Sequence, residues 1–154
     1  MKSLIITFFD YCSTVYNDLS DELGNKLQRS FNYAVRYIFD ARKDEHITPY
    51  FRELDWLKLD ERRTYFLLIL VYKLLILNTG PSYLRNSFTL LSSVHNRNTR
   101  SHNYTLQLPG SRTVMFHSSF VATASRLWNS LPQEIVFSKS LRSFKRSLYT
   151  HLRG

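Results

Sequence analysis

The stretch Phe66-Leu-Leu-Ile-Leu-Val-Tyr-Lys-Leu-Leu-Ile-Leu77 is the longest apolar run in the chain. It contains Lys73 and is well short of the roughly 20 residues that a membrane-spanning helix requires, so no membrane partner is expected. Because the run is apolar on almost every side of a helix, it predicts a buried central helix of about residues 60–77. Asn78-Thr79-Gly80-Pro81 gives that helix a firm end.

Helical patterns lie on both sides of this run. Ser20, followed by Asp21, Glu22 and an apolar repeat at three- and four-residue spacing, predicts a capped helix over about residues 21–39. Thr48, as an N-cap before Pro49, predicts a short helix through about Leu54. Two further helices are expected, one over about 118–130 behind Ser118 or Ser119 and one from Leu141 behind Ser140.

The remaining segments are more polar. From Ser82 to about Asn103 the apolar periodicity gives way to Ser, Asn, Arg and His, which is typical of a linker. Two alternating segments, Tyr104–Leu108 and Arg112–Phe116, flank Pro109-Gly110-Ser111 and predict a small β-hairpin near residues 104–116. We therefore expect a mainly α fold with a helical region over 1–80, a basic linker over 81–103, and a basic extension over 104–154 made of the hairpin and two helices.

The charge of the chain is concentrated in its second half. Residues 78–154 contain ten Arg and Lys against the single carboxylate Glu134, whereas residues 1–77 contain eleven of each sign. The formal charge of +9 and the pI near 9.8 therefore arise from one half of the chain. Such one-sided charge is typical of proteins that contact nucleic acid or another anionic surface.

The sequence offers little for catalysis by this chain alone. It has no adjacent Asp pair for two-metal chemistry and no Gly-rich phosphate loop, and capping or solvation explains its acidic pairs. His95 and His102 make a weak metal pattern, and no cofactor is expected. The sole thiol, Cys12, is expected to be a small buried hydrophobe; one cysteine excludes an internal disulfide and favours a reducing, intracellular setting.

Exposed basic side chains are the better candidates for function. Arg97 and Arg100 lie among Asn96, Asn98 and the two histidines, where several donors could reach phosphates, and Tyr104 could add a stacking surface. A solvated loop and an ordinary wet helix face are the alternatives for these residues. The predicted nucleic-acid-binding set is Arg97, Arg100, Arg112, Arg142, Lys145 and Arg146.

Three groups of segments follow one another along the chain: Phe9–Ser13 with Lys26–Arg29 and Ala34–Arg36; Leu54–Leu57 with Glu61–Arg63 and Tyr72-Lys73; and Leu127–Pro132 with Ser143–Lys145. Gly80-Pro81-Ser82-Tyr83-Leu84 and the Arg-Asn-rich Asn96–Arg100 join them. In this order the segments resemble the C-terminal part of reverse transcriptases encoded by non-LTR (LINE-type, jockey-like) retrotransposons, and the resemblance covers nearly the whole chain.

The resemblance implies a thumb-like helical region followed by a C-terminal extension that grips template RNA and primer DNA. It also implies a truncated open reading frame, since Met1 falls where the family has the inside of a helix. The palm aspartates and the endonuclease of the family are not in this sequence, so the expected role is non-catalytic. Val15-Tyr16 departs from the family's common Val-Trp, and no Cys/His knuckle occurs.

Two alternatives to nucleic-acid binding stay open. The apolar segment from Leu4 to Phe9 could dock on a palm domain of another copy, or on itself as a dimer. The chain could also be a retrotransposon-derived relic with no selected function. The two tryptophans do not decide between these, because Trp128 is expected to anchor a core and Trp56 to seal an interface between helices.

Overall fold

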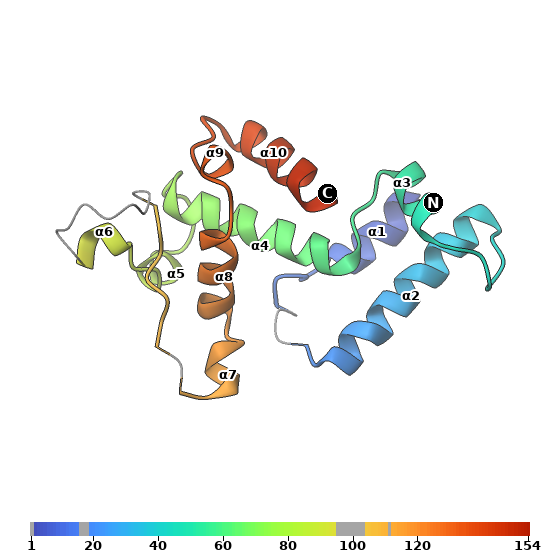
Figure 1. Ribbon diagram of the computed structural model, residues 1–154, viewed down its shortest axis with the longest axis horizontal. Helices are drawn as coiled ribbons and strands as arrows, with labels where there is room; N and C mark the ends of the chain where they lie inside the picture. Colours follow the sequence, from blue (N-terminus) through green and yellow to red (C-terminus); the bar gives the residue numbers. More distant parts are fainter. Residues whose placement is uncertain (1, 16–18, 95–103, 111) are drawn as a thin grey trace. The chain divides into compact units, whose positions relative to one another are not determined.

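The structure is a computed structural model that describes residues 2–15, 19–94, 104–110 and 112–154 (Figure 1). Over these residues the regular elements are helices, and the expected mainly α class is confirmed. The chain divides into two compact units, Met1–Arg63 with Arg153 and Thr64–Leu152 with Gly154. This division falls within one helix and differs from the predicted region boundaries near residues 80 and 103.

The first unit contains three helices and the start of a fourth. The second helix confirms the predicted bounds, and Oγ of its N-cap Ser20 accepts a hydrogen bond from the Leu23 amide at 3.4 Å. The third also forms as predicted, but Ile47 is its N-cap and Thr48 its first helical residue, so the expected Thr48 cap is wrong. These helices are α1 (Lys2–Asp10), α2 (Asp21–Phe39) and α3 (Thr48–Leu54), followed by α4 (Leu59–Leu75).

An aromatic cluster forms the core of the first unit. Phe31 is fully buried, and its ring stacks on Trp56 with a centroid distance of 5.7 Å and an interplanar angle of 9°. Phe9 and Phe51 approach the same ring at 4.9 and 5.5 Å. Trp56 thus joins packed elements as expected, whereas Leu23, which begins the predicted apolar stripe of α2, is 48% exposed.

Polar contacts fix α4 against the other helices of the first unit. Arg62 Nε donates to Asp10 Oδ1 at 2.7 Å, and both side chains are largely withdrawn from water. The Leu59 amide donates to Oε1 of Gln28 at 3.1 Å. An amide in the first turn of a helix has no partner within the helix, so Gln28 satisfies one of these donors from α2.

The second unit is built around the apolar part of α4, as the sequence predicts. Leu67, Leu68, Val71 and Leu74 are buried in one hydrophobic cluster with side chains from the later helices. The later helices are α5 (Ser82–Asn86), α6 (Leu91–Val94), α7 (Val114–His117), α8 (Phe120–Asn129), α9 (Gln133–Val136) and α10 (Leu141–Arg153).

Two aromatic residues anchor this cluster. Trp128 is fully buried, as predicted, and its Nε1 donates to the carbonyl of Tyr104 at 2.9 Å. Tyr72 stacks on Phe144 at 4.2 Å between ring centroids and donates its hydroxyl hydrogen to the Ser138 carbonyl at 2.7 Å. The α4, α8 and α10 helices are thereby joined through one aromatic group.

Glycine ends α4 in the expected place. Asn78 and Gly80 both have positive φ, 51° and 116°, and the Thr79 amide bonds to the Lys73 carbonyl at 2.9 Å. A Cβ atom on Gly80 would lie 2.9 Å from Leu74 Cδ2. Glycine is therefore required here by both conformation and space.

The predicted hairpin over 104–116 is wrong for the residues that the structure describes. The Leu106 backbone instead forms an isolated antiparallel bridge with Leu90, and both its amide and its carbonyl bond to the Asn129 side chain, at 2.9 and 2.8 Å. Thr113 caps α7, so the expected second strand begins a helical turn. The alternation of apolar and polar residues did not decide the structure here, because contacts with residues distant in sequence outweigh the local preference for strand.

Candidate nucleic-acid interface

The exposed face of α10 carries the clearest cationic surface in the part of the chain that the structure describes. Arg142, Lys145 and Arg146 are all exposed, while Phe144 and Leu148 on the other face of the helix are fully buried. Oγ of Ser140 accepts from the Ser143 amide at 3.2 Å, which confirms the predicted cap. Residues three and four apart are neighbours on a helix, so these three cations form one strip.

Two features strengthen the positive potential of this strip. The first turn of α10 contains Arg142 and no acidic residue, so the positive end of the helix dipole is not offset locally. The second feature is the scarcity of negative charge, since Glu134 on α9 is the single carboxylate of residues 78–154. Lys139 adds a further exposed cation just before α10. Packing fixes the buried side of α10, which holds the strip on a rigid base.

Arg112 does not join the α10 strip. It is exposed immediately before α7, next to the cap residue Thr113. Within the second unit, α7 precedes the start of α8 whereas α10 follows its other end, and Figure 1 shows the two helices well apart. The structure therefore brings together Arg142, Lys145 and Arg146 and leaves Arg112 as a separate exposed cation.

The predicted loop contacts cannot be placed. Arg97 and Arg100, together with Asn96, Asn98, His95 and His102, lie outside the described residues. Their assignment as phosphate-binding or metal-binding residues stays a prediction from sequence.

Tyr104, expected to be a stacking surface for bases, makes contacts within the protein instead. Its carbonyl accepts from Trp128, and its half-buried ring packs edge to face on Phe137 with centroids 5.8 Å apart. The aromatic side chains with the most exposed rings lie elsewhere, and Tyr83 beside Gly80-Pro81 is 70% exposed. Sequence composition alone does not separate these tyrosines.

No family model, curated protein or solved structure matches this chain.

The residues considered for catalysis occupy surface or capping positions. Cys12 is exposed in a turn with φ of 53°, so the expectation that it is a buried hydrophobe is wrong. Asp21-Glu22 and Asp60-Glu61 lie in the first turns of α2 and α4, as the capping interpretation predicts. The described residues contain no group of three or more His, Cys, Asp or Glu that could hold a metal ion, and no helix among them is long and apolar enough to cross a membrane.

A second basic surface, not predicted from the sequence, lies on α2. Arg29, Tyr33 and Arg36 line a shallow hollow with Asn32 and Lys43. Arg36 is used structurally, since it donates to the carbonyls of Arg42 and Glu45 at 3.2 and 3.0 Å. The three- and four-residue spacing of these residues, opposite Phe31 and Val35, is the signal that could have identified the surface.

This α2 surface differs from α10 in its charge balance. The loop that supplies Arg42 and Lys43 also contains Asp40, Asp44 and Glu45, all exposed. Carboxylates in the same loop reduce the attraction of this surface for phosphates. The α10 strip is therefore the better candidate.

Proposed function

We propose that this chain is a non-catalytic C-terminal fragment of a non-LTR retrotransposon RNA-directed DNA polymerase, comprising its thumb and the region that follows. Its basic half binds template RNA and primer DNA. The observation that carries the proposal is the strip of Arg142, Lys145 and Arg146 on α10, exposed in a unit with almost no negative charge. The resemblance to the C-terminal part of these enzymes supports the same role.

The strip acts through the phosphate backbone. Guanidinium groups bind phosphate oxygens in pairs of hydrogen bonds, and the lysine adds a point charge between them. Such contacts position a protein on nucleic acid without reading its sequence. Arg97, Arg100 and Arg112 would extend the contact along the strand.

The test is binding of the purified chain to single-stranded RNA, an RNA–DNA hybrid and duplex DNA, followed by fluorescence anisotropy over a salt series. Release of counterions from several phosphates predicts that affinity falls by about a hundredfold or more between 50 and 200 mM salt. A flat salt response, or no binding at 50 mM salt by folded protein, would refute the proposal.

A second candidate function is protein interaction through α1. Leu4 and Phe8 on α1, and Tyr11 directly after it, are 77%, 80% and 75% exposed, and grouped exposed apolar side chains are typical of protein-interaction sites. The partner would be the palm domain of a polymerase or a second copy of this chain. Self-association predicts that sedimentation equilibrium gives a rising mass with concentration and that Phe8→Ser abolishes the rise.

A further inference from the structure

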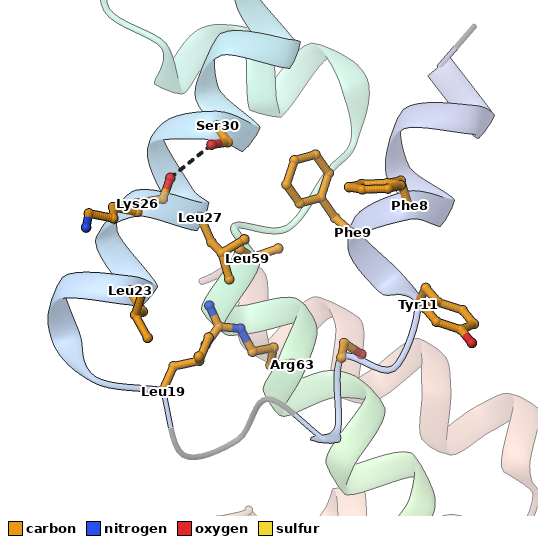
Figure 2. Close-up of a pocket in the computed structure, with 11 residues that line it drawn as sticks. Phe8, Phe9, Tyr11, Leu19, Leu23, Lys26, Leu27, Ser30, Leu59 and Arg63 are labelled. Carbon is orange, nitrogen blue, oxygen red and sulfur yellow. Dashed lines mark hydrogen bonds between the residues drawn. The ribbon is translucent and has the colours of Figure 1, made fainter.

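The first unit contains a large apolar pocket between α1, α2 and the start of α4. Its volume is about 560 Å³, and Phe9, Leu23, Leu27 and Leu59 are among the side chains that line it (Figure 2). Pockets of about 300–1,000 Å³ with mostly apolar walls are the usual size for small-molecule ligands. The pocket lies entirely within the first unit and does not depend on the proposed nucleic-acid interface.

One wall of this pocket is cationic. Arg63 on α4 lines it, and its side chain retains only 15% of its surface exposed. Figure 2 shows the side chain extending from α4 toward Leu23 and Leu27 of α2. Lys26 is at the rim, where it pairs with Glu22 at 2.8 Å and is mostly in water. Arg63 is therefore the charged group that the apolar walls enclose.

The guanidinium of Arg63 is incompletely satisfied. Its Nη2 atom is buried and donates no hydrogen bond to any residue that the structure describes. Asp60 Oδ1 lies 3.3 Å from Nη2, at ion-pair distance, and the Asp60 side chain is 78% exposed. The neighbouring Arg62, by contrast, donates two hydrogen bonds to the Asp10 carboxylate. A buried donor without an acceptor is costly, and an anion that supplies the acceptor recovers that cost.

These observations together define a ligand. We infer that the pocket binds a small amphipathic carboxylate, whose apolar body contacts the leucine and phenylalanine walls and whose carboxylate accepts hydrogen bonds from Arg63. A neutral ligand of the same shape would gain the apolar contacts but would give Nη2 of Arg63 no anionic acceptor. A cationic one would meet Arg63 and Lys26 with charge repulsion.

The test uses the full chain and three probes of one length: decanoate, decan-1-ol and decylammonium, each below its micelle concentration. Titration calorimetry measures affinity, and chemical-shift changes of backbone amides locate the site. We expect decanoate to bind about tenfold more tightly than the alcohol and the ammonium to bind most weakly. Equal affinity for decanoate and decan-1-ol, or shift changes outside α1, α2 and the start of α4, would overturn the inference.

Substitutions separate charge from shape. Arg63→Met keeps most of the side-chain volume and should reduce decanoate affinity to within about threefold of the alcohol. The matched control, Arg29→Met, removes an equal charge from the exposed face of α2 outside this pocket and should leave the preference intact. Leu23→Trp should fill the pocket and weaken decanoate and alcohol alike. Should Arg63→Met fail to fold, the three probes on the unmodified chain still decide the question, and an unchanged preference in folded Arg63→Met would refute it.

Discussion

The two units differ in the balance of charge on their side chains. The second unit buries Trp128, Phe144 and Leu148 fully in a cluster around α4 and carries an excess of cations. The first unit balances its charges, and each unit leaves some apolar side chains exposed, such as Phe8 in the first and Val114 and Met115 in the second. The two units therefore differ in the net charge that they present, and not in whether apolar side chains are exposed.

The largest expected effect concerns the core of the second unit. Trp128→Ala removes a fully buried ring and its hydrogen bond to Tyr104, and we expect it to lower the free energy of unfolding by about 3–5 kcal/mol. Urea denaturation, monitored by far-UV circular dichroism, measures the change in unfolding free energy. Trp56→Ala is the control in the first unit; its half-buried ring should cost clearly less. Equal losses would break the contrast between the two cores.

The next prediction concerns the two hydrogen bonds between the Asn129 side chain and the Leu106 backbone, which lie where the sequence predicted a hairpin. Asn129→Ala leaves the Leu106 amide and carbonyl without their side-chain partner, and we expect a loss of about 2 kcal/mol in unfolding free energy. Asn25→Ala, at an exposed position of α2, should be neutral or slightly stabilising because alanine favours helix. Similar results for both variants in urea denaturation would show that the Asn129 contacts do not hold the 104–108 segment.

A smaller effect concerns pH. Burial raises the pKa of Tyr72 above its ordinary value of 10, with a lesser contribution from Tyr104, so the unfolded chain loses this proton at lower pH than the folded chain. The unfolded state then binds fewer protons, and the stabilisation from neutral Tyr72 is present below pH 10 and lost as pH rises toward the folded pKa.

Tyr72→Phe provides the check on that pH effect. It should cost about 1 kcal/mol near neutral pH through the lost bond to Ser138, and its stability should decline less than that of the unmodified chain above pH 10. Parallel declines in thermal denaturation of the two proteins would exclude Tyr72 as the titrating group.

The sequence predicted the elements that depend on local patterns. The bounds of α2 follow from its apolar repeat and the Ser20 cap, and the end of α4 follows from Asn78 and Gly80. The hairpin failed because Leu106 pairs with Leu90 and Asn129, partners that no local pattern indicates. Phe88, inside the predicted linker, is buried in the core for the same reason.

The candidate site divides in the same way. An amphipathic pattern with a serine cap was sufficient to place Arg142, Lys145 and Arg146 on the exposed face of α10. Arg63 looked like one of several charges at a helix start, and only packing shows that apolar walls surround it. Burial and unmet hydrogen bonds are properties of the three-dimensional arrangement, so the pocket could not be predicted.

The most direct test of the account compares two triple variants with the same net charge. One replaces Arg142, Lys145 and Arg146 of α10 by Gln, and the other replaces Arg29, Arg42 and Lys43 of the first unit, all exposed. The measurement is the slope of log Kobs against log salt for a single-stranded RNA. If α10 holds the interface, the α10 variant loses about two units of slope and at least about tenfold in affinity, and the first-unit variant changes little. Equal losses in both variants would mean that only the net charge of the chain matters, and would contradict the proposed interface on α10.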